Sequence, residues 1–165
     1  GIHSIEHGIF LDEEAIELML ENGTFLVPTL LAPVAVLEIG EAGGMPDFGL
    51  QKSREVIDIH RDSIRRAHEA GVKIAMGTDA GVMPHGTNLC ELGLMVEAGL
   101  SPMEAIVATT RTAAECLGWD GRLGTIEAGK TADIVISSAD PLAGINSLAD
   151  NDTIWMVMQD GVRVI

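Results

Sequence analysis

Apolar residues recur at helical spacing in four segments of the first 118 residues, and shorter β-type runs lie between them. The helical segments are 11–23, 50–71, 87–99 and 101–118, and each of them ends on a glycine, a common residue just after a helix. The runs at 2–5, 24–30 and 72–79 are rich in apolar and β-branched residues and predict strands. The resulting order β-α-β-α-β-α-α is typical of a parallel sheet covered by helices.

Local signals define several boundaries of these elements. Asp12 is the expected N-cap of the first helix, and residues 101–104 (Ser-Pro-Met-Glu) form a capping box with proline in the first turn. Residues 31–49 contain four glycines and two prolines and predict a loop. The long helix at 50–71 is amphipathic, and its expected buried positions are Val56, Ile59, Ile64 and Ala67.

The spacing of the β-α units suggests part of a barrel. Position 79 follows position 7 by 72 residues and two such units, so eight units would take roughly 290 residues, an ordinary size for a (β/α)8 barrel. Three strands cannot close a barrel. The alternatives are a small open sheet or the last third of a barrel, and the abrupt start on a strand favours the second.

The pattern changes after Gly118 to short β segments at 124–142 and 153–165, separated by turn residues. We therefore expect one structural part over 1–118 and a second over 119–165. The second part contains aspartates that could suggest calcium binding, but their spacing is not that of an EF-hand and favours solvated turns. These aspartates are Asp140, Asp150, Asp152 and Asp160.

Composition excludes some classes of partner. The net charge of −15 argues against binding to nucleic acid or to an anionic membrane surface, and no uninterrupted run of 18 apolar residues suggests a membrane span. Cys90 and Cys116 match no zinc spacing, and we expect reduced, packed thiols, which favours a reducing compartment such as the cytoplasm. No signal peptide is visible at the start of the chain.

Strand alternation places a carboxylate at the end of the run 72–79. Asp79 lies on the face opposite the bulky apolar residues, which we expect to pack on the helices. That apolar set is Val72, Ile74 and Met76, and the face of Asp79 also carries Lys73, Ala75 and Gly77. Barrel enzymes place their active sites at this end of the strands, although Asp and Gly are also ordinary turn residues.

The same test on the first strand places His3, Ile5 and His7 on one face, with His7 at the end of the strand before Gly8. One imidazole and one carboxylate would then lie at C-terminal strand ends. Histidine nitrogen and aspartate oxygen are both zinc ligands. The sequence therefore favours His7 and Asp79 as candidate ligands of a divalent metal.

Several motifs, taken in chain order, are distinctive: SIEHG, VPT, GVKIAMGTDAG, PHGTNLCEL, MVEAGLSPMEAIVATTRTAAECLG and GTIEAGKTADIVI. Together they resemble the C-terminal half of the amidohydrolase superfamily, and in particular its metal-dependent Xaa-Pro dipeptidase (prolidase-like) and zinc carboxypeptidase branch. The resemblance implies an α/β fold. Residues 1–118 would be strands 6–8 and helices of a TIM (β/α)8 barrel, and 119–165 the C-terminal part of a small composite β-sandwich.

The resemblance also implies roles for three residues. His7 matches the metal ligand after barrel strand six, and Asp79 matches the aspartate after strand eight that binds metal and transfers protons. His85 lies in the loop above the pocket and is a candidate contact for a substrate carboxylate. The implied cofactor is one or two divalent ions, zinc by preference, with the remaining ligands outside this chain. We interpret His3 and Glu6 as structural, and we expect His60 and His68, on the long helix at 50–71, to be solvated or packed.

The implied activity is hydrolysis of an amide or peptide C–N bond by metal-activated water, in a dipeptidase or N-acyl-amino-acid hydrolase. A cyclic-amide hydrolase or a deaminase of the same superfamily is the alternative within enzymes. A third possibility is a catalytically incomplete piece without activity of its own. We expect a small-molecule or dipeptide substrate and a homo-oligomer of the full-length protein.

Overall fold

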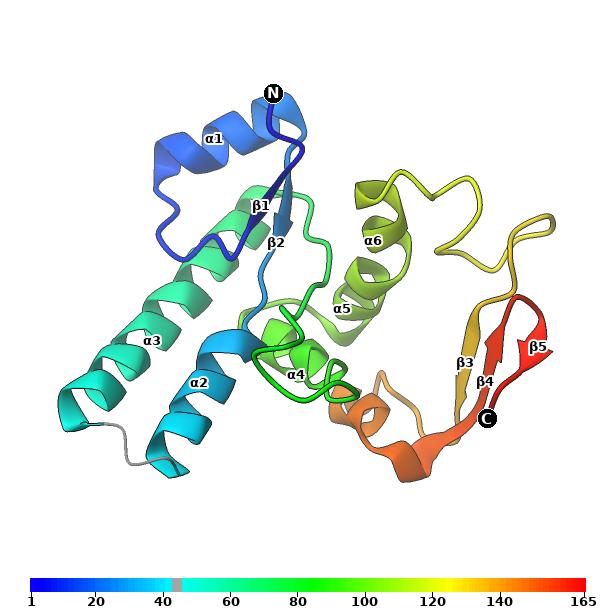
Figure 1. Cartoon of the computed structure of the whole chain (residues 1–165). Helices are drawn as coiled ribbons and strands as arrows, with labels where there is room; N and C mark the ends of the chain where they lie inside the picture. The colour runs from blue at the N-terminus through cyan, green and yellow to red at the C-terminus, as the bar shows by residue number, and fades with distance from the viewer. Residues whose placement is uncertain (43–45) are drawn as a thin grey trace.

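A computed structural model describes residues 1–42 and 46–165 (Figure 1). Strands β1 (Ser4–Glu6) and β2 (Phe25–Val27) are parallel neighbours, and the extended segment 72–79 continues the sheet through a parallel bridge between Leu26 and Ile74. The helices are α1 (Glu13–Asn22), α2 (Leu31–Ala42), α3 (Asp47–Ala70), α4 (Cys90–Glu97), α5 (Pro102–Thr109) and α6 (Arg111–Cys116). The β-α alternation and the α/β class are as predicted.

A second, antiparallel sheet consists of β3 (Ile134–Ser137), β4 (Ile154–Gln159) and β5 (Val162–Arg163). Short 3-10 helices, η1 (Ile145–Ala149) and η2 (Asn151–Thr153), connect β3 to β4. In Figure 1 this sheet stands apart from β1 and β2, beyond α5 and α6. A groove of about 820 Å³ lies between those helices and the small sheet.

The predicted helix signals act as expected. The Asp12 carboxylate accepts the backbone N–H of Ala15 at 2.8 Å, and Gly23 ends α1 with a left-handed backbone (φ 64°). Ser101 and Glu104 form the reciprocal capping box at the start of α5. These contacts satisfy amide groups at helix starts that have no partner inside their own helix.

Three predictions about helices were wrong. Residues 31–42 form α2 instead of a loop, and Pro33 lies in its first turn, where a missing N–H costs little. Residues 47–49 of the predicted loop belong to α3, and positions 43–45 lie outside the described residues. The predicted helix over 101–118 is broken at Thr110 (φ −115°, ψ −86°). In α3, Ile59 is exposed and Val56 is half-buried, whereas His60 is fully buried.

The core lies mainly on one face of the β1–β2 sheet. Leu26 and Ile74 pack there against Ile64 of α3 and Leu92 of α4. Ala75 is on the other face with Phe25 and Val27, next to Cys116 of α6. Alternation along 72–76 is therefore confirmed, with the bulky residues toward the helices. Figure 1 shows β1 and β2 between α3 and α6.

The prediction that His3, Ile5 and His7 share one face of the first strand was wrong. Ile5 is opposite Leu26 and packs on the helix side, whereas the ring of His3 lies against Phe25, with centroids 5.2 Å apart, on the other side. The regular strand covers only residues 4–6, so the alternation does not extend to His3 and His7. His3 also bonds to the Cys116 carbonyl through Nε2 at 2.8 Å, which agrees with a structural role.

The cysteines agree only in part with the expectation. Cys90 and Cys116 are both free thiols, as predicted. Cys116 is half-buried beside the sheet, but Cys90 is exposed and is therefore not packed. Within the described ranges, none of the helices is both long and apolar enough to cross a membrane.

We expect Gly77→Ala to destabilise the fold. A β-carbon at Gly77 would collide with Cγ1 of Val27 on the neighbouring strand, and overpacking of this kind typically costs about 1–3 kcal/mol. Urea denaturation of the intact protein measures the loss. Gly121→Ala is the matched control, because its β-carbon would meet open space. Equal unfolding midpoints for the two variants would contradict the close approach of the two strands.

Candidate active site

Three residues other than glycine have left-handed backbones where the parallel segments end. They are His7 (φ 67°) after β1, Thr29 (φ 52°) after β2 and Asp79 (φ 57°) at the end of 72–79. This conformation costs of order 1–3 kcal/mol per residue and persists where surrounding contacts impose it, often at active sites. Since the segments run parallel, their carboxyl ends lie along one edge of the sheet.

The left-handed backbone also changes how the side chains of His7 and Asp79 are aimed. Strand alternation assumes an extended backbone, and it no longer applies where φ is positive. Both side chains are exposed. The sequence therefore located these two residues at strand ends, but pleat geometry alone does not give their direction.

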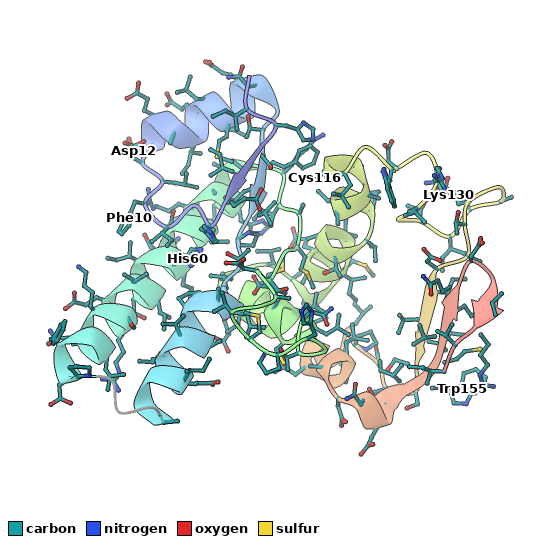
Figure 2. The ribbon with its side chains drawn as sticks, viewed as in Figure 1. Phe10, Asp12, His60, Cys116, Lys130 and Trp155 are labelled. Atoms are coloured by element: carbon teal, nitrogen blue, oxygen red, sulfur yellow. The ribbon has the colours of Figure 1, made fainter. Side chains whose placement is uncertain are left out.

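Helix α3 holds the loop that follows β1. The Nε2–H of His60 donates to the His7 carbonyl at 2.7 Å, and the hydroxyl of Ser63 donates to the Gly8 carbonyl at 2.6 Å. The backbone N–H of Leu11 donates in turn to the Ser63 oxygen at 3.1 Å. His60 and Ser63 are three positions apart and both buried, so they lie on one face of α3. Figure 2 shows His60 where α3 passes the end of β1.

The burial of His60 decides its charge. Burial lowers the pKa of this imidazole by more than the nearby carbonyls of His7 and Pro28 raise it. At neutral pH the ring is therefore uncharged, and the nitrogen that faces the His7 carbonyl carries the proton. His60 was expected to be either solvated or packed, and it is packed: its buried ring holds the backbone of His7.

The imidazole of His7 bonds to the hydroxyl of Thr29, with 2.6 Å between Nδ1 and Oγ1. The Thr29 hydroxyl also donates to the Pro28 carbonyl at 2.7 Å. A hydroxyl has one proton, so toward His7 the Thr29 oxygen acts as the acceptor. From these partners we assign the proton of the neutral His7 ring to Nδ1, which leaves the lone pair on Nε2.

Glu91 of α4 is a fully buried carboxylate that sequence reasoning missed. Its two oxygens accept the backbone N–H groups of Leu30 and Leu31, each at 2.7 Å, where α2 begins. Burial raises the pKa of Glu91 to about 7, and the two amides partly oppose this. An acidic residue within the apolar run of 89–96 was the available signal.

Asp79 and His85 are the other two candidate residues. Both are exposed, and the Asp79 carbonyl accepts the N–H of Val82 at 3.2 Å in the turn that follows. His85 lies farther along the same loop. Across residues 1–42 and 46–165, no three or more His, Cys, Asp or Glu side chains form a group that could hold a metal ion.

Two of the aspartates for which calcium binding was the alternative, Asp140 and Asp150, accept backbone amides in turns. Asp140 accepts the N–H of Leu142 at 2.9 Å, and Asp150 accepts that of Asp152 at 3.0 Å. These carboxylates cap local turns, as the spacing suggested.

We expect Glu91 to make stability depend on pH. Because its pKa is about 7 in the folded protein and 4.5 ordinarily, the folded state holds the proton more tightly between these values, and stability falls as pH rises through that window. The total is about 3 kcal/mol, at about 1.4 kcal/mol per pKa unit. Urea denaturation from pH 4.5 to 7.5 should show the wild-type protein losing this amount relative to Glu91→Gln.

The matched control for this experiment is Glu97→Gln on the same helix. Glu97 is exposed and pairs with Arg61 at 2.9 Å, so its substitution should leave the pH dependence of the wild type nearly intact. Parallel stability curves for the wild type and Glu91→Gln would show that the carboxylate of Glu91 titrates normally.

Comparison with known proteins relates the whole chain to one family. Residues 1–164 match the model of the amidohydrolase family. The ochratoxinase of Aspergillus niger is 32% identical over 163 residues, which are 98% of this chain and 33% of that protein.

Solved structures give the same relationship. The chain superimposes on a Xaa-Pro dipeptidase with methionine bound in its active site, with a TM-score of 0.88 and 42% identity over 99% of this chain and 40% of the other. The superposition on a prolidase complexed with N-methylphosphonate-L-proline has a TM-score of 0.87 and 35% identity, and it covers 99% of this chain and 40% of the prolidase. The chain thus spans between a third and two fifths of these relatives.

Proposed function

Because this chain belongs to the amidohydrolase family, we propose that it forms part of a metal-dependent hydrolase that cleaves an amide or peptide C–N bond. The proposed substrates are dipeptides of the Xaa-Pro type or N-acyl amino acids. The observation that carries the proposal is the convergence of His7, Thr29 and Asp79, all with left-handed backbones, on one edge of the parallel segments. The similarity to a Xaa-Pro dipeptidase and to a prolidase supports the substrate class.

The proposed architecture places these residues in a larger barrel. Strands β1 and β2 and the segment 72–79 would be the last three strands of a (β/α)8 barrel, within residues 1–118. Residues 119–165, with β3 to β5, would belong to a small β-sandwich. The alternation of strands and helices along the chain and the parallel pairing of β1 with β2 support this division.

The donor set fits a divalent cation. The Nδ1–H of His7 is engaged by Thr29, so Nε2 is available as a ligand, and Asp79 offers carboxylate oxygens on the same edge. Nitrogen and oxygen donors together suit zinc. The other ligands would come from outside this chain. When bound, such a cation supplies a Lewis acid that polarises the scissile carbonyl and lowers the pKa of water from about 15.7 to about 7.

Three residues of this chain would have separate roles in the reaction. His7 would hold the cation in a fixed orientation, because its other nitrogen is bonded to a buried hydroxyl. Asp79 would accept a proton from the attacking water and deliver it to the amine nitrogen as the C–N bond breaks. His85 would contact the carboxylate of the substrate from the loop that follows Asp79.

We expect Asp79→Asn in the intact protein to lower kcat toward a Xaa-Pro dipeptide by about 10²–10⁴-fold, the usual contribution of a positioned general base. The reason is that an amide cannot accept the proton of the attacking water. Steady-state kinetics at saturating zinc, with metal content and urea denaturation measured in parallel, check this result.

Asp120→Asn is the control for this substitution, since Asp120 is an exposed aspartate in a turn after α6. It should leave kcat unchanged. A kcat for Asp79→Asn close to the wild-type value, with metal bound, would remove the proton-transfer role of Asp79.

A further inference from the structure

A continuous connection runs from the buried carboxylate of Glu91 to the imidazole of His7. Glu91 accepts the N–H groups of Leu30 and Leu31 at 2.7 Å each. Leu30 follows Thr29 directly in the chain, and Thr29 Oγ1 lies 2.6 Å from His7 Nδ1. Helix α4 is thus joined to the candidate metal ligand by hydrogen bonds and one peptide link.

Glu91 accepts amides at the start of α2 that a nearby hydroxyl could otherwise accept. A threonine at the start of a helix commonly uses its hydroxyl to accept a free amide of the first turn, and Thr29 lies two positions before Leu31, the first residue of α2. Here the Thr29 hydroxyl is engaged by His7 and by the Pro28 carbonyl, and only the Thr29 carbonyl accepts from α2, from the N–H of Ala32 at 3.2 Å. Because Glu91 satisfies the next two amides, the hydroxyl of Thr29 is free for His7.

The conformation of Thr29 depends on the same contacts. A β-branched residue rarely adopts a left-handed backbone, yet Thr29 has φ 52° and is only 4% exposed. The two hydrogen bonds to Glu91 fix the peptide groups immediately after it. Together with the bond from Ala32 N–H to the Thr29 carbonyl, they oppose relaxation of Thr29 to a common conformation, which would carry its hydroxyl away from His7.

We propose that Glu91 is a positioning residue for His7: by holding the first amides of α2, it fixes Thr29 so that its hydroxyl keeps the proton of His7 on Nδ1 and directs Nε2 to the site. This role rests on the proposed function of His7 as a metal ligand. Glu91 is fully buried and its oxygens are bonded to the amides of Leu30 and Leu31, so it acts through Thr29. A local cap would have sufficed to start the helix alone. This role explains why a buried carboxylate is found there instead.

Two readouts test the proposal in the intact protein. The tautomer of His7 is read from the ring ¹⁵N chemical shifts of the metal-free, ¹⁵N-histidine-labelled protein at pH 8, with His7 identified by the loss of its signals in His7→Gln. Zinc affinity is read by competition with a chromophoric chelator. The wild type should show the Nδ1–H tautomer.

Glu91→Gln should give a mixture of tautomers and a zinc affinity about 10–100-fold weaker, the usual effect of losing a partner that orients a metal ligand. A glutamine oxygen can accept one of the two amides, but its NH₂ group cannot accept the other. Glu97→Gln on the same helix is the matched control and should behave as the wild type in both readouts.

Substitutions of Thr29 keep the test valid if Glu91→Gln does not fold. Thr29→Val keeps the β-branched shape without the hydroxyl and should reproduce the mixed tautomers and the weaker zinc binding. Thr29→Ser keeps the hydroxyl and should restore the wild-type ring shifts. Ring shifts of His7 that match the wild type in both Glu91→Gln and Thr29→Val would overturn the positioning role.

The two readouts separate the positioning role from the proposed function. If the ring shifts of His7 change in the variants while zinc affinity stays at the wild-type value and zinc leaves the His7 signals unmoved, Glu91 positions the ring but His7 is not a metal ligand. That result would overturn the proposed function at His7 and leave the hydrogen-bonded connection standing.

Discussion

The hydrogen bond between His7 Nδ1 and Thr29 Oγ1 is the contact on which the arrangement of the site depends. It joins the ends of two neighbouring parallel strands, and it is made by residues whose own backbones are in an unfavourable conformation. One such bond contributes only about 0.5–1.5 kcal/mol net, which does not offset the backbone strain. The geometry must therefore be imposed by the surrounding structure.

That support comes from helices far away in the sequence. Helix α3 holds the backbone after β1 through His60 and Ser63, and helix α4 holds the start of α2 through Glu91. All three side chains are buried and polar, and such groups are stabilising only when they are hydrogen-bonded. The apolar core under β2 and the segment 72–79 fixes these helices in turn, so that core packing and site geometry are coupled.

The sequence predicted the helices and strands better than the contacts between them. Capping signals such as Asp12 and the Ser101–Glu104 box act over a few residues, and they were readable without a structure. The helix at 31–42 was missed because its first amides are satisfied by Glu91, 60 positions away, and not by a local cap. The contact between Thr29 and His7 also joins residues far apart in the sequence, and the periodicity of apolar residues does not predict it. Alternation identified the faces of 72–76 correctly but could not give the direction of His7 or Asp79, since both leave the extended conformation.

Diffraction at the zinc absorption edge, from crystals of the intact protein grown with zinc, tests this site most directly. We predict an anomalous peak within bonding distance of His7 Nε2 and of the Asp79 carboxylate, with His7 Nδ1 still bonded to Thr29. A peak elsewhere, or one bonded to His7 through Nδ1, would contradict the assignment of these residues and of the hydrogen bond that orients them.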